Sequence, residues 1–134
     1  MKKFCSKCNR LHDHDYNCTV GKFDRYYRDD QAYKLRNSRR WWRTRDETLD
    51  RDHHLCVACR LLNSYLNAYK LEVHHIIDVR ICIDRGMVEL VYDVENCITL
   101  CQHHHRLVHS DDLDLPPLLE LAGLKLPEAY PPTL

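Results

Sequence analysis

Two pairs of potential metal ligands constrain the fold of this chain more than any other feature of its sequence. Cys56 and Cys59 are separated by two residues, and Cys101 and His104 have the same separation. Four thiolate and imidazole ligands complete a closed tetrahedral zinc site, which is the structural type of site. The two pairs therefore predict a structural zinc that joins distant segments, with ordinary buried thiols as the alternative interpretation of Cys56 and Cys59.

Cysteine and histidine are both abundant, with eight and ten copies among 134 residues. The basic start of the chain is not followed by an apolar stretch of signal-peptide length, so we expect a cytoplasmic protein with reduced cysteines. No apolar run has the length of a membrane span, so we expect no membrane partner. Reduced Cys-x-x-Cys pairs favour zinc over disulfides, and a small core gains stability from such a metal.

Charge is unevenly distributed along the chain, although the formal net charge is zero. Six basic and no acidic residues lie between Lys34 and Arg45, whereas the part from Asp111 onwards carries five acids and one lysine. A basic segment with interleaved aromatic residues favours contact with DNA phosphates, and a solvated helix face is the plainer interpretation. Both hold at once if Trp42 packs inward and the arginines face solvent. The predicted DNA-binding residues are Arg36, Arg39, Arg40, Arg43 and Arg45.

The distribution of residue types divides the chain into four segments. They are a Cys/His-rich head (1–20), a basic helical segment (21–52), a Cys/His core (53–110) and a Leu/Pro-rich acidic tail (111–134). Hydrophobic periodicity predicts helices over 26–36 and 38–51, the second of them capped by Ser38. β-Branched and alternating residues predict strands over 71–77 and 87–92, paired as a hairpin. A helix, or a loop running into one, is expected over 94–110.

A second set of histidines lies close to the zinc-type ligands in the sequence but on different faces of the expected elements. On a helix, Cys101 and His104 can meet one ion while His105 and His109, one turn apart, meet another. Consecutive strand residues point to opposite faces, so one of His74 and His75 is expected to bind this second ion. The other is then placed to act as a general base, because imidazole titrates near neutral pH. A three-histidine site leaves coordination positions open, as catalysis requires.

These residues together resemble the HNH, or ββα-metal, endonucleases. The resemblance rests on three stretches: Cys56-Val57-Ala58-Cys59, Val73-His74-His75-Ile76-Ile77, and the run from Asn96 to His109. It implies an α+β protein with a ββα-metal core, flanking helices and one or more structural zinc knuckles. It also implies metal-dependent hydrolysis of DNA phosphodiester bonds, which leaves 5′-phosphate and 3′-hydroxyl ends.

The resemblance also implies a role for each matching residue. His75 corresponds to the general base, and His74, His105 and His109 to the ligands of the catalytic ion. Asn96 corresponds to the motif asparagine, which is expected to hold the loop that bears the base. One divalent catalytic metal is implied, and the histidine-rich ligand set is compatible with Mg²⁺, Mn²⁺, Ni²⁺ or Zn²⁺. Most relatives with such cysteines have a cysteine at the position of His104, where imidazole here replaces thiolate.

The head and the tail suggest further partners. The head resembles the zinc knuckle that precedes the nuclease domain in short phage-type HNH proteins, so a second zinc is an open alternative. Its candidate ligands are Cys5, Cys8, Cys18, His12 and His14. The chain's size and layout resemble phage nucleases that work beside the DNA-packaging terminase, which is therefore a candidate partner. The sequence leaves the oligomeric state open.

Two functions of other classes compete with the nuclease interpretation. A noncatalytic zinc-binding module for DNA or protein explains the cysteines and the basic segment equally well. It does not explain why His75 adjoins a metal ligand opposite a half-open histidine site. A metal-storage or redox protein agrees with the cysteine count but not with the basic segment.

Overall fold

The protein is described by a computed structural model, in which residues 1–5, 10–13, 15 and 30–130 are placed well enough to describe. The chain divides into two compact units, Met1–Arg36 and Asn37–Leu134. In the first unit, β1 (Lys2–Cys5) pairs antiparallel with β2 (Arg10–Asp13), and α2 spans Gln31–Arg36. Cys5 and His12 lie in this hairpin, whereas the candidate zinc ligands Cys8, His14 and Cys18 lie outside the described residues.

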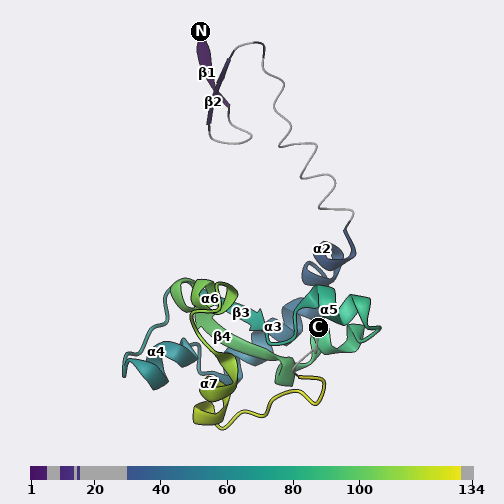
Figure 1. Ribbon diagram of the computed structural model, residues 1–134, viewed down its shortest axis with the longest axis vertical. Helices are drawn as coiled ribbons and strands as arrows, with labels where there is room; N and C mark the ends of the chain where they lie inside the picture. Colours follow the sequence, from purple (N-terminus) through teal and green to yellow (C-terminus); the bar gives the residue numbers. More distant parts are fainter. Residues whose placement is uncertain (6–9, 14, 16–29, 131–134) are drawn as a thin grey trace. The chain divides into compact units, whose positions relative to one another are not determined.

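The second unit carries the remaining elements in a mixed α+β arrangement. They are α3 (Arg39–Arg51), α4 (Val57–Leu62), β3 (Leu71–His75), α5 (Val79–Asp84), the 3-10 helices η1 (Val88–Tyr92) and η2 (Val94–Asn96), β4 (Cys97–Cys101), α6 (Gln102–His109) and α7 (Leu115–Ala122). Figure 1 shows β3 and β4 in the middle of this unit, with α6 and α7 on either side of them. Among the described residues, no helix has the length and apolar character needed to cross a membrane.

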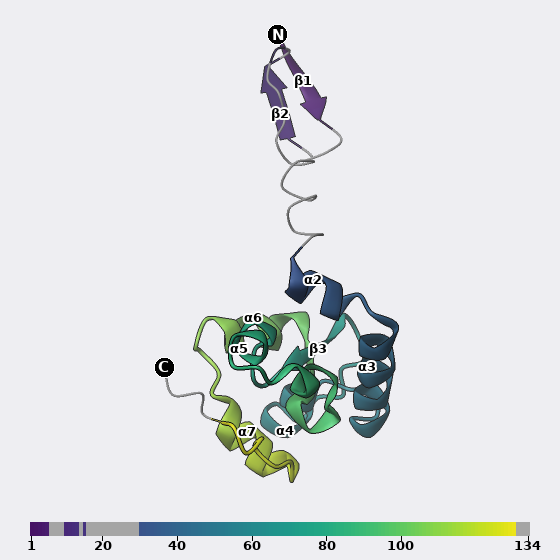
Figure 2. The same ribbon diagram turned by 90° about the vertical axis from the view of Figure 1, so that its right-hand side faces the viewer.

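Helix α3 begins as its sequence predicts. Ser38 is the N-cap, and its Oγ accepts a hydrogen bond of 3.2 Å from the backbone N–H of Trp41. The expected orientation of the tryptophans was wrong, because Trp41 is 6% exposed and Trp42 is 48% exposed. Trp41, Thr44 and Thr48 recur at helical spacing and are all buried, so they form the inward face of α3. Figure 2 shows α3 and α7 on different sides of the unit.

The hairpin partner of β3 differs from the one that the sequence predicts. Residues Val88–Tyr92 form a 3-10 helix, and β3 pairs antiparallel with β4 instead, with Leu71 opposite Cys101 and His75 opposite Cys97. All five residues of β4 are buried. A strand buried on both faces shows a continuous apolar run rather than alternation, so its pattern does not distinguish it from a helix. Where the sequence predicts a helix, or a loop running into one, over 94–110, the structure has a strand over Cys97–Cys101 and a helix that starts at Gln102.

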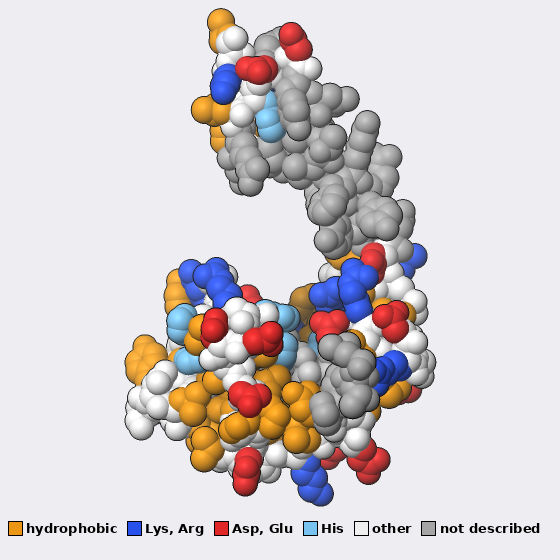
Figure 3. Space-filling view, in the orientation of Figure 1, with side chains coloured by type: hydrophobic (Ala, Val, Ile, Leu, Met, Phe, Trp, Pro, Cys, Tyr) orange, Lys and Arg blue, Asp and Glu red, His pale blue; other side chains and the backbone are white. Residues whose placement is uncertain are grey.

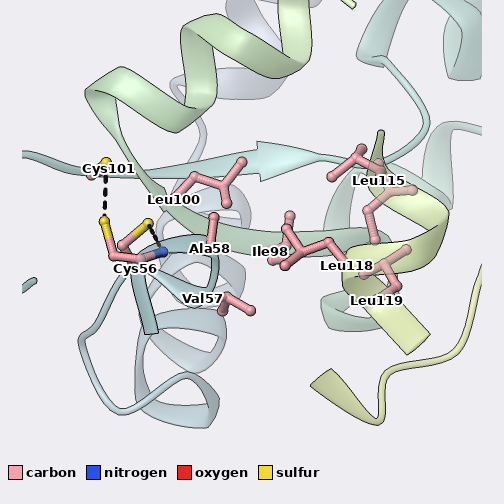
Figure 4. Close-up of a cluster of buried hydrophobic side chains, with 11 residues drawn as sticks. Cys56, Val57, Ala58, Ile98, Leu100, Cys101, Leu115, Leu118 and Leu119 are labelled. Atoms are coloured by element: carbon pink, nitrogen blue, oxygen red, sulfur yellow. Dashed lines mark hydrogen bonds between the residues drawn. The ribbon is translucent and has the colours of Figure 1, made fainter. Parts of the chain in front are cut away.

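The core lies between β4 and the helices α4 and α7. Ile98 and Leu100 from β4, Val57 and Ala58 from α4, and Leu118 from α7 are almost fully buried in it, as Figure 4 shows. Helix α7 begins with prolines in its first turn and ends at Gly123, whose φ of 69° is the left-handed conformation that glycine adopts readily. These contacts hold α4 against the end of the hairpin.

An ion pair at the end of α3 connects this helix to β4. The Asp52 carboxylate is buried and accepts a 2.9 Å hydrogen bond from the backbone N–H of Thr99. It also receives the Arg51 guanidinium at 2.9 Å, and this guanidinium donates further bonds of 2.8 and 2.7 Å to the carbonyls of Val94 and Cys97. The pair thus satisfies backbone groups on two neighbouring segments.

We predict that Asp52→Ala lowers the free energy of unfolding by about 3 kcal/mol, because it leaves Arg51 without its partner and the N–H of Thr99 without an acceptor. Urea denaturation of both proteins measures the difference. Asp46→Ala is the matched control, since Asp46 is an exposed carboxylate on the same helix and its removal should change stability little. Equal stability of the Asp52 and Asp46 variants would contradict this role.

Candidate metal centres and active site

Four buried ligand-type side chains converge from three elements of the second unit. Cys56 and Cys59 lie at the start of α4, Cys101 ends β4, and His104 lies in the first turn of α6. Their donor atoms all lie within 4.8 Å of one another. His104 Nδ1 is 3.6, 3.4 and 3.2 Å from the sulfur atoms of Cys56, Cys59 and Cys101, and Cys59 Sγ is 3.8 Å from Cys101 Sγ. We call this group the Cys3His cluster.

These separations agree with one tetrahedral zinc ion. Bonds of about 2.3 Å to sulfur and about 2.0 to 2.1 Å to nitrogen place two thiolates about 3.8 Å apart and a thiolate about 3.6 Å from an imidazole nitrogen. The surrounding polar groups also suit thiolates, since the backbone N–H of Cys59 donates to Cys56 Sγ at 3.4 Å and Asn67 Nδ2 donates to Cys59 Sγ at 3.6 Å. The cluster therefore fits a metal ion in both distance and donor type.

Burial alone opposes charging the thiols of Cys56 and Cys101. It raises the pKa of Cys56 to about 12. For Cys101, burial also acts upward, but hydrogen bonds from the backbone N–H of His104 and from the two other cysteines outweigh it and lower the pKa. Burial and neighbouring His103 lower the pKa of His104, which keeps the imidazole in its neutral, metal-binding form. A bound cation would offset the cost of deprotonating Cys56.

A second cluster consists of His74 from β3 and of His105 and His109 from α6. Their donor nitrogens also lie within 4.8 Å of one another. The Nε2 atoms of His105 and His109 are 3.0 Å apart, within the separation of about 2.8 to 3.4 Å expected for two nitrogens bound at about 2.0 to 2.1 Å to one octahedral or tetrahedral ion. Burial, followed by the neighbouring histidines, lowers the pKa of His74 to about 3, so its imidazole is neutral at pH 7. We call this group the three-histidine cluster.

Glu72 is a functional candidate that the sequence interpretation missed. Its carboxylate accepts a hydrogen bond from His105 Nδ1, which directs the Nε2 atom of the same ring toward His109. Carboxylates commonly orient metal-binding histidines in this way. The signal was present in the sequence, because Glu72 precedes His74 by two residues and so shares its face of β3.

His75 is adjacent to His74 and is oriented by other groups. Its ring lies 4.3 Å from the ring of Trp41, and its Nε2 is 3.1 Å from the carbonyl oxygen of Val91. Because a carbonyl only accepts, Nε2 carries the hydrogen in the neutral ring, and Nδ1 carries the lone pair that can take a proton. His74, His75 and His109 line one cleft of about 270 Å³, so the structure brings the predicted base and two of the three predicted ligands to the same opening.

Asn96 is fully buried behind this cleft, at the end of η2. Its Oδ1 accepts a 2.8 Å hydrogen bond from the backbone N–H of Ile77, and its Nδ2 donates to the carbonyls of Ile77 and Leu90 at 3.2 and 3.1 Å. The side chain thus holds the segment that follows His75 against the 3-10 helices. This position agrees with the loop-holding role expected for Asn96, which stays a prediction.

The predicted DNA-binding arginines have different surroundings. Arg39 and Arg43 are exposed on α3. Arg40 forms an ion pair with Glu89 and stacks 4.2 Å above the ring of Tyr92, and Arg45 lies 5.5 Å from the ring of Trp42. Arg36 belongs to the other unit, where its Nε donates to the carbonyl of Ala32 at 3.3 Å. Four of the five arginines therefore share one helix.

Comparison with known proteins identifies the class of this fold. No model of a known protein family matches the chain, and no curated protein matches it. Among solved structures, it is similar to the HNH endonuclease of the deep-sea thermophilic bacteriophage GVE2, in a crystal structure with manganese ion. The two are 28% identical with a TM-score of 0.50, and the match covers 68% of this chain and 91% of that one. The chain thus has the α+β fold of an HNH endonuclease, and the resemblance found in its sequence is confirmed.

We predict that the purified protein carries a tightly held zinc ion and that Cys59→Ala or Cys101→Ala releases one equivalent of zinc per chain. Both variants should also lose stability, because the cluster joins α4 to the β4–α6 corner. Elemental analysis after dialysis measures the metal content. Cys82→Ala is the control, since Cys82 is an equally buried thiol outside the cluster. If the Cys59 and Cys101 variants retain as much zinc as Cys82→Ala does, the ion is not held by the Cys3His cluster.

Proposed function

We propose that this protein is a metal-dependent endonuclease that hydrolyses phosphodiester bonds in DNA. The observation that carries the proposal is the position of His75, which is fixed by Trp41 and by the Val91 carbonyl and lines one cleft with His74 and His109 of the three-histidine cluster. The similarity to an HNH endonuclease supports the same reaction. With the Nε2 hydrogen directed at the Val91 carbonyl, Nδ1 is the nitrogen that would take a proton.

The proposed reaction is an in-line displacement at phosphorus. His75 Nδ1 takes a proton from a water molecule, whose oxygen then bonds to phosphorus while the bond to the 3′ oxygen breaks. The leaving oxygen takes a proton from solvent, so the products carry 5′-phosphate and 3′-hydroxyl ends. A divalent ion held by His74, His105 and His109 would supply positive charge that stabilises the phosphate and the leaving oxygen. Asn96 keeps the segment beyond His75 in place during these steps.

The donor set leaves several ions as candidates for this site. Imidazole nitrogens suit Zn²⁺ and Ni²⁺, and the similar phage structure was crystallised with manganese. Mg²⁺ prefers oxygen ligands and would rely on substrate and water oxygens for most of its shell. We propose that the Cys3His cluster holds a separate structural zinc, because thiolates favour that ion.

The exposed arginines of α3, chiefly Arg39 and Arg43, are proposed to contact DNA phosphates. Arg40 is proposed to contribute less to DNA binding, because Glu89 pairs with its charge and Tyr92 stacks on it. The phage terminase remains a candidate partner from the sequence interpretation alone.

We predict that His75→Ala lowers the rate of plasmid cleavage by about 10²- to 10⁴-fold, the usual contribution of a general base. The variant should still bind divalent ion, since His74, His105 and His109 are unchanged. Cleavage is measured after chelator treatment and resupply of Mg²⁺, Mn²⁺, Ni²⁺ or Zn²⁺ in separate reactions. His54→Asn is the control, because His54 is an exposed histidine that belongs to neither metal cluster. If wild type binds DNA but cuts with none of these ions, a noncatalytic module replaces the proposal.

We predict that Glu72→Gln weakens binding of Mn²⁺ to the three-histidine cluster by about 10- to 100-fold, because the charge that orients His105 is lost. Calorimetric titration of protein that retains its structural zinc measures the affinity. Glu120→Gln removes an exposed carboxylate on α7 and should leave the affinity unchanged. An unaltered affinity in the Glu72 variant would show that His105 is oriented without it.

A further inference from the structure

The segment that joins α4 to β3 presents an unusual surface. Its large side chains point into solvent: Leu62 is 46% exposed, Tyr65 59%, Leu66 69% and Tyr69 72%. The sequence from Arg60 to Lys70 also contains no acidic residue. Exposed apolar side chains gathered in this way generally mark a contact surface. We call residues 62–70 the tyrosine loop.

The tyrosine loop is held in place by the Cys3His cluster. The backbone N–H of Tyr65 donates to the carbonyl of Cys59 at 3.0 Å, and the N–H of Cys56 donates to the carbonyl of Asn67 at 2.8 Å. Ser64 and Lys70 adopt positive φ angles of 52° and 51°, which non-glycine residues keep only where the surroundings impose them. The loop is therefore a fixed platform whose tyrosines stay exposed while its backbone is anchored.

A lysine ammonium accompanies these rings. The Lys70 ammonium lies 5.4 Å from the centre of the Tyr69 ring. The backbone N–H of Gln102 donates to the carbonyl of Lys70 at 3.0 Å, which brings the start of α6, with exposed His103, next to the loop. Figure 3 shows hydrophobic side chains at the end of the unit where Figure 1 draws α4, close to histidine and basic side chains.

Exposed aromatic rings with cations and without acids are the chemistry that binds nucleobases of single strands. Phosphate contacts alone would need only the cations, and a base pair inside a duplex offers no free face for stacking. We propose that Tyr65 and Tyr69 stack on unpaired bases, so that the preferred substrate is DNA with unpaired bases beside the cleaved bond. This inference rests on the proposed nuclease function and names its substrate class.

The distance between the loop and the three-histidine cluster sets where these bases lie. His74 is four residue steps along β3 from Lys70, which is about 13 Å at 3.3 Å per step. At about 3.4 Å per nucleotide along a stacked duplex strand, this corresponds to roughly four nucleotides. The unpaired bases are therefore expected about four nucleotides from the scissile phosphate.

The test compares the double variant Tyr65→Ala/Tyr69→Ala with its parent, both in the His75→Ala background so that DNA is not cut, and both zinc-loaded. Fluorescence anisotropy is measured with a labelled duplex that contains a single-stranded gap and with the same duplex fully paired. We expect binding of gapped DNA to weaken tenfold or more, with less than a twofold change for paired DNA. The salt dependence should not change, because no charge is removed.

Two further proteins act as matched controls. Tyr65→Phe/Tyr69→Phe keeps the rings and should bind like the parent, and Leu121→Ala removes an exposed leucine from α7 and should have no effect. A 2-aminopurine placed in the gap reports stacking directly, and its fluorescence change on binding should be absent in the double alanine variant. An equal loss on both DNAs, or none on either, would overturn the inference.

Failure of this inference is distinguishable from failure of the proposed function. If wild-type protein cuts DNA, and the tyrosine variants cut and bind gapped DNA equally well, only the role of the tyrosines is refuted. Wild-type protein that cuts no DNA with any of the four ions refutes the nuclease function itself. Loop variants that bind DNA normally but lose self-association in sedimentation would assign the loop to a protein contact and also overturn the inference.

Discussion

The Cys3His cluster is the constraint on which the geometry of the second unit depends. Its ligands come from the start of α4, the end of β4 and the first turn of α6, so one ion would fix the direction in which α6 leaves the hairpin. That direction determines where His105 and His109 point. The hydrophobic core beside the cluster is small and made largely of Leu, Ile and Val side chains, which pack without strong directional preference, whereas tetrahedral ligation is directional.

Helix α6 contributes side chains to both clusters, because consecutive residues of a helix point in different directions. His104 turns inward toward three thiols, and the next residue, His105, faces His74 and His109. The strand β3 makes a similar division, with His74 at the three-histidine cluster and His75 against Trp41. Two adjacent pairs of histidines are thus divided by backbone geometry alone. A shift of one residue in the register of β3 against β4 would exchange the positions of His74 and His75.

The sequence predicted the clusters better than it predicted the elements that carry them. Ligand spacing does not depend on the assigned secondary structure, so Cys101 and His104 were grouped as ligands of one site although 94–101 was interpreted as part of a helix or of a loop leading into one. The alternation in 87–92 suggested a strand, but only Val91 is buried in that element and it forms a 3-10 helix. Trp41 and Trp42 are chemically equivalent in the sequence, and which one turns inward depends on which face of α3 packs against the rest of the unit. Glu72 was missed because its role depends on a contact with α6, which is distant in sequence.

The surroundings of His75 also bear on the choice between an enzyme and a noncatalytic zinc module. A module that only holds DNA or protein gains nothing from a buried imidazole whose Nε2 hydrogen is fixed by a carbonyl. Asn96 adds to the argument, because three hydrogen bonds from one buried amide hold the segment after His75 more firmly than packing alone requires. Both features follow if His75 must keep one position beside a phosphate while it accepts a proton.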